Sequence, residues 1–433
     1  MAHAVSSQED SMASIGPSGL RFCAVSFMDA SCKTAYPYGN AIDGRGRNVF
    51  SVAQVFQTSR ASSLLVLSLL PVIDTLMDSA YPSSSAPSPA LQELAAEAAA
   101  RQKKASGHSG RRTLPLRVGT RGSPLALVQT RAFLTTLTRF CPVLRDMGAF
   151  QEHQINTTGD QVQNRRLAEI GGKGLFAKEI HEALADGRID FAVHSLKDLE
   201  TTLPPGLVLA CTLKREDARD ALILSPGLAQ SDPDDPYSAL PEGALIGCAS
   251  VRRQAQMLHV RPDLKFGLLR GNVQTRLDKL AAHQCQATLL ALAGLKRLGM
   301  AERASIVLDP TVMVPAAGQG IVGVTVREDD IELRELLSAI EDYEARAVAT
   351  AERSLLAELD GSCRTPIGGY AQLIPIVAGE DPKLHLTGLV AREDGSFLLK
   401  RSITGLPEDA ARLGKELGES LRKDSPSDIF EEN

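Results

Sequence analysis

The sequence predicts an α/β protein with a small α+β region at its C-terminal end. From about residue 114 onward, short apolar runs such as "IDFAVH", "ALIGCAS" and "ATLLALAG" are each followed by a helical pattern. Strands that alternate with helices favour largely parallel sheets. Later in the chain, "LHLTGLVAREDGSFLLKRSI" predicts a hairpin that turns at Asp394-Gly395. A helix with Leu413, Leu417 and Leu421 on one face follows it.

The predicted elements begin and end at characteristic residues. "LPLRVG" is typical of a strand, and Ser123 with Pro124 predicts the start of the helix that follows it. Ser250 is a predicted N-cap for the helix "VRRQAQMLHV", and Asn272 is one for "VQTRLDKL". Each predicted helix therefore starts just after the carboxyl end of a strand.

Composition limits the class of protein. The 433 residues suffice for two or three domains, and a net charge of −5 argues against a general nucleic-acid-binding protein. The seven cysteines have neither disulfide nor metal spacing, which predicts a reduced protein of the cytoplasm. We expect no metal, no nucleic acid and no membrane as partners.

Residues 1–113 differ from the rest, because they are rich in Ser and Ala and look like an extension with a linker. Their one apolar stretch is shorter than the roughly 20 residues that a bilayer span requires. Two interpretations stay open. The segment is a targeting or regulatory extension, which would place the protein in a plastid or another organelle, or the start codon was assigned too far upstream.

Basic residues gather at the predicted turns, where helix N-termini already favour anions. Each of them alone could be a solvated surface residue, but together they predict an anionic ligand with carboxylates or phosphates, which guanidinium groups bind in pairs of hydrogen bonds. "IGGKGLF" resembles a P-loop but lacks its Ser or Thr. The basic residues are Arg121, Lys173, Arg252, Arg253, Arg270 and Arg276.

Two further features point to chemistry. The strand "DFAVHS" ends at Lys197 and Asp198, which are either an exposed ion pair or a catalytic pair. As a catalytic group, Asp198 could be a general acid, a general base or an electrostatic stabiliser. Cys363 lies in the Gly/Ser/Pro-rich loop "LDGSCRTPIGGY", just after a predicted helix, with no second cysteine nearby.

From about Leu114 to the C-terminus, the chain resembles the porphobilinogen deaminase (hydroxymethylbilane synthase) family. The resemblance rests on ordered motifs: "RVGTRGSPLALVQT", "TTGD", "IGGKGLFAKEI", "FAVHSLKDL", "REDARDALI", "SVRRQAQML", "LRGNVQTRLDKL", "LALAGLKRLG", "PAAGQGIVGV" and "LDGSCRTPIGGY". The chain departs from the common pattern at Thr158, Glu169 and Glu200, where Arg, Lys and Pro are frequent in the family.

The resemblance implies a transferase of heme and tetrapyrrole biosynthesis. Such an enzyme joins four porphobilinogen molecules head to tail into hydroxymethylbilane and releases ammonia. It implies that Cys363 carries a covalent dipyrromethane cofactor and that Asp198 and Lys197 are catalytic, with Asp198 stabilising the cation that forms when ammonia leaves. The other cofactor contacts that it implies are Lys197, Asp198, Ser250, Arg252, Arg253 and Arg276. The implied substrate contacts are Arg121, Ser123, Lys173, Phe176, Arg270 and Arg297, although Phe176 could equally be a core residue of a helix with Ile180 and Leu184.

The resemblance also implies the architecture: two α/β domains like those of periplasmic binding proteins, plus a small C-terminal α+β domain, in a monomer. The expected boundaries are 114–213 for the first domain, completed by about 319–338, then 214–312, then 339–433 with the cofactor cysteine. The alternative function is a non-catalytic two-domain anion-binding or sensor protein. It accounts for the arginines but not for Lys197-Asp198 together with Cys363.

Overall fold

The computed structural model describes residues 114–162, 174–229, 232, 234–359, 365–375 and 381–430. Lys173 and Cys363, as well as the whole of 1–113, lie outside these residues. Within the described residues, no helix has the length and apolar character that a membrane span requires.

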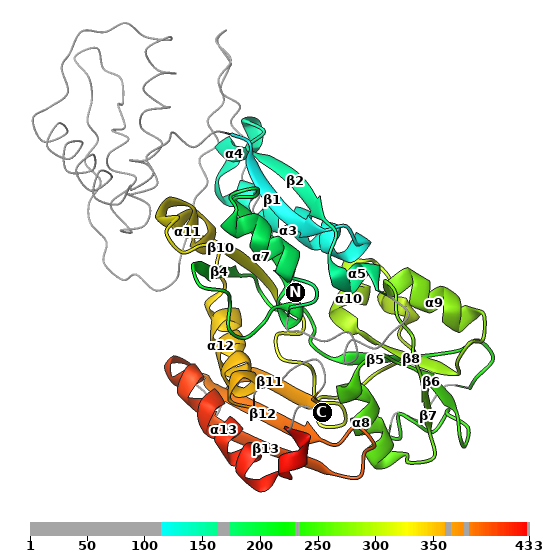
Figure 1. Ribbon diagram of the computed structural model, residues 1–433. Helices are drawn as coiled ribbons and strands as arrows, with labels where there is room; N and C mark the ends of the chain where they lie inside the picture. The colour runs from blue at the N-terminus through cyan, green and yellow to red at the C-terminus, as the bar shows by residue number, and fades with distance from the viewer. Residues whose placement is uncertain are drawn as a thin grey trace, which may run out of the picture. The chain divides into compact units, whose positions relative to one another are not determined.

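The first sheet has five strands in the order β2-β1-β3-β10-β4 (Figure 1). These strands are β1 (Leu116–Arg121), β2 (Phe150–Ile155), β3 (Phe191–Ser195), β4 (Leu207–Thr212) and β10 (Val322–Arg327). The helices between or after them are α3 (Pro124–Phe140), α4 (Pro142–Asp146), α5 (Thr158–Gln161), α7 (Lys178–Ala185) and α11 (Ile331–Ser338). Phe133 of α3 packs edge-on against Phe191 with ring centroids 6.0 Å apart, and both are fully buried. The helices thus cover an apolar sheet.

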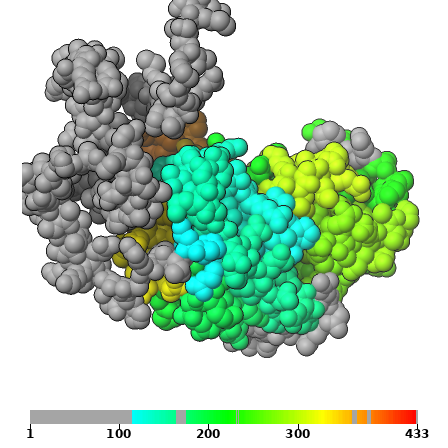
Figure 2. Space-filling view, turned by 90° about the horizontal axis from the view of Figure 1, so that it is seen from above, coloured from blue at the N-terminus to red at the C-terminus, as the bar shows by residue number. Residues whose placement is uncertain are grey.

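The second sheet also has five strands, in the order β7-β6-β8-β5-β9. They are β5 (Asp220–Leu224), β6 (Leu245–Gly247), β7 (Lys265–Gly267), β8 (Ala287–Ala291) and β9 (Ile306–Val307), with helices α8 (Val251–Val260), α9 (Val273–Ala281) and α10 (Leu292–Arg297) and the 3₁₀ turn η3 (Ala301–Arg303). Helix α3 contacts α10: a Cβ added at Gly294 of α10 would lie 3.4 Å from Leu125 of α3. Figure 2 shows the cyan residues of the first sheet's helix beside the yellow-green residues of the second.

Both five-stranded sheets are mixed, but in each of them four strands run in the same direction and one runs the opposite way, so the expectation of largely parallel sheets holds except for one strand in each sheet. β1 pairs in parallel with β2 and β3, and β6 does so with β7 and β8. However, β10 runs antiparallel to β3 and β4, and β5 runs antiparallel to β8 and β9. The physical reason is the path of the chain. β5 and β10 are the strands with which the chain enters one sheet from the other, so neither follows a helical crossover within its own sheet.

The C-terminal unit is the predicted α+β structure. Its antiparallel sheet has the order β11-β12-β13, formed by Ile367–Ile374, Lys383–Ala391 and Leu398–Gly405. Helices α12 (Tyr343–Glu358) and α13 (Ala410–Asp424) share one core with this sheet, and the 3₁₀ turns η4 (Pro407–Asp409) and η5 (Ser427–Ile429) flank α13 (Figure 1). Gly395 adopts φ +76° at the predicted hairpin turn. Leu413, Leu417 and Leu421 are buried, as their spacing predicts.

A buried ion pair joins the C-terminal unit to the residues that connect the two larger sheets. Glu352 of α12 is fully buried and accepts a hydrogen bond of 2.7 Å from Arg215, which follows β4. The same carboxylate accepts from the backbone N–H groups of Gly318 and Ala371, at 2.6 and 2.7 Å. One side chain therefore fixes the loop before β10, the strand β11 and the connection from β4 to β5.

Candidate functional site

The predicted catalytic residues follow β3 directly, in the short 3₁₀ turn η2 (Leu196–Asp198). Because β1 and β3 are parallel neighbours, their carboxyl ends meet at one edge of the sheet, and β1 ends at Arg121. Arg121 Nη1 donates to Asp198 Oδ2 at 3.1 Å. The topology therefore brings together two residues that are far apart in sequence.

Arg121 is shared between two carboxylates. Its Nε donates to Asp160 Oδ2 at 2.9 Å, its Nη2 also donates to Asp160, and Thr157 donates to the same carboxylate at 2.8 Å. Despite its burial, the pKa of Asp160 is below its ordinary value because Arg121 stabilises the anion. We call Arg121, Asp160 and Asp198 the Asp198 cluster. One guanidinium and two carboxylates give it a formal charge of −1, and 28% of the Asp198 side chain remains exposed.

A second cluster, in the second sheet, has a formal charge of the opposite sign. Asp220, the first residue of β5, is fully buried and accepts hydrogen bonds from Arg252 at 2.8 Å and from Arg253 at 2.6 Å. Both arginines lie in the first turn of α8, which begins after β6 at its N-cap Ser250. We call Asp220, Arg252 and Arg253 the Asp220 cluster, and its formal charge is +1. Burial opposes the charge of Asp220, but the two arginines hold its pKa well below the usual range.

Gln319 connects Asp220 to Lys197. Its Nε2 donates to Asp220 Oδ1 at 2.8 Å, and its Oε1 accepts a hydrogen bond of 3.1 Å from Lys197 Nζ. It lies between Gly318 and Gly320, which have φ values of +75° and +88°, and a Cβ at Gly320 would lie 2.3 Å from the Glu216 carbonyl oxygen. Only glycine fits this turn without strain. The turn therefore fixes the buried amide of Gln319 between the two charged groups.

Lys197 occupies an electrostatically unfavourable position. Burial of its ammonium group, with repulsion from Arg253 and Arg252, lowers its pKa from 10.5 to about 8, although Asp198 and Asp220 act in the opposite direction. Although Lys197 as a whole is exposed, its ammonium group donates a hydrogen bond to the buried Gln319. The lowered pKa therefore reflects the surroundings of the ammonium group and not those of the rest of the side chain. Among the described residues, no carboxylate forms an ion pair with Lys197. A ligand carboxylate would stabilise its charge.

The other predicted arginines border the same site. Arg276, in the first turn of α9, donates from Nε to the Gly271 carbonyl at 2.9 Å, and burial together with Arg253 lowers its pKa to about 10. It has no ion-pair partner among the residues that the structure describes. Arg270 is buried and donates to the Gly159 carbonyl at 2.9 Å, and Arg297 donates to the Gly320 carbonyl at 2.7 Å. The arginines of the second sheet thus reach groups attached to the first.

Two predicted substrate contacts, Ser123 and Phe176, interact with other residues of the chain. Ser123 is the N-cap of α3 and accepts a hydrogen bond of 3.3 Å from the Ala126 N–H, as its sequence predicts. Phe176 lies in a turn before α7 and not within that helix, so the prediction of helical register with Ile180 and Leu184 is wrong. Its half-buried ring lies 4.2 Å from the Arg121 guanidinium, which is a cation–π distance.

Three residues of the site were not predicted from the sequence, namely Asp160, Asp220 and Gln319, although they lie within the motifs "TTGD", "REDARDALI" and "PAAGQGIVGV". Asp220 has a recognisable signal, because a carboxylate that opens the apolar strand "DALIL" must find cations when the strand is buried. Gln319 has a weaker one, the two flanking glycines. Asp160 gives no sign of its role, since its partner Arg121 is distant in the sequence.

The fold and the site define an α/β protein that holds several basic residues next to a carboxylate at the strand ends. Residues 116–335 match the family described as "Porphobilinogen deaminase, dipyromethane cofactor binding domain", and residues 347–423 match "Porphobilinogen deaminase, C-terminal domain". The chain belongs to the porphobilinogen deaminase family.

Curated relatives agree with this membership. The chain is 46% identical to a porphobilinogen deaminase of Paracoccus denitrificans over 317 residues, which cover 73% of this chain and 96% of that protein. It is also 46% identical to a chloroplastic porphobilinogen deaminase of Pisum sativum, covering 72% of this chain and 82% of that one. Among solved structures, a periplasmic VFT2 domain of Bordetella pertussis BvgS matches 59% of this chain and 97% of its own, with 16% identity and a TM-score of 0.30. We draw no conclusion about fold or function from a structural similarity of this degree.

Proposed function

We propose that this chain is a porphobilinogen deaminase that joins four porphobilinogen molecules into hydroxymethylbilane on a dipyrromethane cofactor bound to Cys363. The observation that carries the proposal is the site itself. Lys197 and Arg276 have no carboxylate partner among the described residues, and they lie beside Asp198 in a chain of this family. The alternative, a non-catalytic anion-binding or sensor protein, is not favoured, because the relatives are named as deaminases.

The residues present fit a dipyrromethane group, whose pyrroles carry acetate and propionate side chains. Lys197 and Arg276 each bear a charge that burial disfavours, so a bound carboxylate would restore the charged form of both. The Ser250 hydroxyl accepts from the Arg253 N–H at 3.4 Å and keeps its own proton for donation. When bound, this group supplies the pyrrole carbon to which the first substrate is joined.

Arg252 and Arg253 act differently from Lys197 in this proposal. Their guanidinium groups already bind Asp220, and Arg253 also donates to the Leu289 carbonyl at 2.9 Å. We therefore infer that they hold one wall of the site in place and contribute a net positive field. A carboxylate that approaches Lys197 or Arg276 meets this field without having to displace Asp220.

Asp198 is the proposed catalytic residue. Loss of ammonia from porphobilinogen leaves an electron-poor pyrrole, which is cationic when protonated. Since Arg121 is shared with Asp160, it cannot neutralise Asp198 completely, and the negative charge of the Asp198 carboxylate can stabilise such a cation. The exposed part of the carboxylate can also accept a hydrogen bond from a pyrrole N–H group, and accept and return a proton.

Intact-protein mass spectrometry together with a turnover assay tests the proposal. The purified chain should carry an added mass equal to two pyrrole units, and Cys363→Ala should abolish both that mass and the formation of hydroxymethylbilane. Cys211→Ala is the matched control, because the Cys211 thiol is fully buried and burial raises its pKa to about 12. A bare polypeptide mass, or normal turnover by Cys363→Ala, would overturn the covalent assignment.

The same proposal includes the domain division and the setting. The strands of each sheet support a division into three domains, at 114–213 with 319–338, at 214–312 and at 339–433. Removal of residues 1–113 should leave the melting temperature of the remaining chain unchanged. We infer a cytoplasmic monomer without a nucleic-acid partner, in keeping with the net charge of −5. The alternative location is a plastid, since two relatives are named chloroplastic. Light scattering measures whether the chain is a monomer, and a fluorescent fusion shows whether it is located in the cytoplasm or in a plastid.

A further inference from the structure

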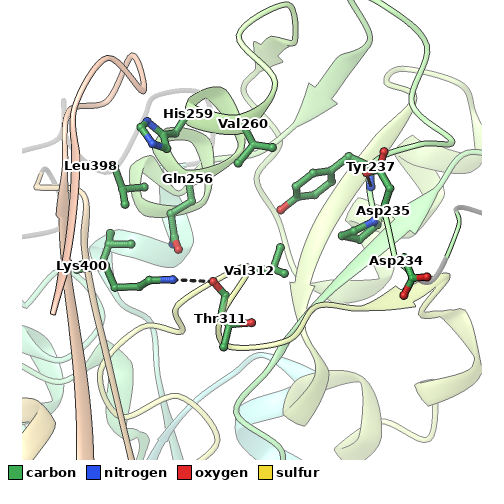
Figure 3. A pocket seen from close by; sticks show the side chains of 12 residues that line it. Asp234, Asp235, Tyr237, Gln256, His259, Val260, Thr311, Val312, Leu398 and Lys400 are labelled. Carbon is green, nitrogen blue, oxygen red and sulfur yellow. Dashed lines mark hydrogen bonds between the residues drawn. The ribbon is translucent and has the colours of Figure 1, made fainter. Parts of the chain in front are cut away.

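A cavity separate from the two charged clusters lies between α8 and the strands β12 and β13 (Figure 3). Its volume is about 320 Å³, and small-molecule sites are commonly about 300–1,000 Å³. The residues that matter for its chemistry are Tyr237, Gln256, Val260, Val312, Leu398 and Lys400. None of them belongs to the catalytic machinery proposed above.

Tyr237 gives the first indication of a ligand. The residue is 2% exposed, and its hydroxyl oxygen is buried without a hydrogen-bond partner in the described part of the chain. Burial, with Asp220 and Asp235 nearby, raises the pKa of the phenol, so it stays neutral and can donate its proton. Figure 3 shows this hydroxyl pointing into the space between Val260 and Val312. Because a buried hydroxyl without a partner is costly, an acceptor in the cavity would stabilise it.

The opposite wall offers a cation. Lys400 Nζ donates to the Thr311 carbonyl at 2.8 Å, and an ammonium group has three N–H donors, so two donors remain for other acceptors. Hydrogen bonds from Thr311 and, less strongly, the charges of Arg219 and Lys400 lower the pKa of the nearby Asp309 carboxyl. The amide of Gln256 is committed to Val314, from whose N–H it accepts at 2.8 Å and to whose carbonyl it donates at 3.2 Å. In Figure 3 the Asp234 carboxylate points away from the space between Tyr237 and Lys400. An anionic group would therefore pair with Lys400.

Apolar side chains lie between these two polar ends. Val260 is 60% exposed and Val312 is 37% exposed, which are large fractions for aliphatic residues. Leu398, on β13, borders the same space, and so does Leu389 on β12. A flat apolar body would cover these side chains and remove their surface from water.

We propose that this cavity is a binding site for a small aromatic carboxylate. The carboxylate pairs with Lys400, the ring lies between Val260 and Val312, and a group at the far end accepts the hydrogen bond of Tyr237. This inference goes beyond the proposed function and does not depend on it.

The test uses the full chain and para-hydroxybenzoate in a ligand-observed NMR titration, with benzoate as the comparison ligand. Para-hydroxybenzoate should bind saturably and more tightly than benzoate, because only the former reaches Tyr237 with an oxygen. Tyr237→Phe should weaken para-hydroxybenzoate roughly threefold to tenfold and leave benzoate unchanged. Lys400→Gln should weaken both ligands roughly tenfold.

Two control variants separate this site from the rest of the molecule. Lys197→Gln should leave the titration unchanged, which excludes binding among the basic residues of the catalytic site. Lys415→Gln removes an exposed lysine on α13 and should also have no effect. The proposal is overturned if neither ligand binds saturably, or if binding survives both Tyr237→Phe and Lys400→Gln at full strength, or if Lys197→Gln abolishes it.

Discussion

Two clusters of the same chemical groups lie on either side of Lys197, and they differ in charge and in burial. The Asp220 cluster has two arginines and one carboxylate, and its three side chains are at most 8% exposed. The Asp198 cluster has one arginine and two carboxylates, whose side chains are 20–32% exposed. In the buried cluster one carboxylate binds two arginines, whereas in the more open cluster Asp198 shares its one arginine, Arg121, with Asp160. We infer that the first builds the site and the second acts on the substrate.

The largest expected effect follows from removing the charge of Asp198. Asp198→Asn keeps the shape of the side chain, so the free energy of unfolding should change by less than about 1 kcal/mol. Single-turnover release of ammonia should fall about 10²–10⁴-fold, because both acid–base catalysis and cation stabilisation are lost. A rate within a few-fold of that of the unmodified chain would show that another group stabilises the cation.

Asp220→Asn should instead cause a large loss of unfolding free energy. Two buried guanidinium groups lose their common carboxylate, and breaking a buried ion pair costs about 3–5 kcal/mol of unfolding free energy. Urea denaturation measures this loss. The control is Asp428→Asn, which breaks the exposed pair with Arg392 and should leave the free energy of unfolding nearly unchanged. Equal losses for Asp220→Asn and Asp428→Asn would contradict the structural role of the Asp220 cluster.

A smaller effect is expected from pH. Lys197 binds a carboxylate only when it is protonated, and its pKa is lowered to about 8 by burial, Arg253 and Arg252, with Asp198 and Asp220 opposing. For the chain that does not yet carry the dipyrromethane cofactor, affinity for the cofactor's carboxylates should therefore be full below about pH 8 and decline as the pH rises above it, a few-fold in all. Titration of Lys197→Gln should lack this decline. A decline that persists in the variant would belong to another group.

Much of the fold followed from local signals. Ser123, Ser250 and Asn272 cap their helices through side-chain hydrogen bonds, and the hairpin turns where a glycine permits it. The antiparallel placement of β10 between β3 and β4 was not predictable in the same way. It depends on where the chain returns from the second sheet, which no local pattern encodes.

The sequence predicted which residues form the site better than it predicted which residues they pair with. The basic residues at the strand ends were found because turns with arginine are unusual in an acidic chain. What they bind depends on contacts across more than thirty positions, as for Arg252 with Asp220 or Arg121 with Asp160. Such contacts follow from the topology, so the difference between a paired and an unpaired cation became visible only in three dimensions.

The charge imbalance of the Asp198 cluster can be tested without touching Asp198. Asp160→Asn leaves Arg121 with Asp198 as its one carboxylate in the cluster, so the formal charge of the cluster changes from −1 to zero. Removing a charge at this range through partly exposed protein is worth about 1–3 kcal/mol. Single-turnover release of ammonia by Asp160→Asn should therefore fall roughly tenfold or more, with the added mass on the chain unchanged. An unchanged rate would contradict the account, because Asp198 would then act without the incomplete neutralisation that distinguishes the two clusters.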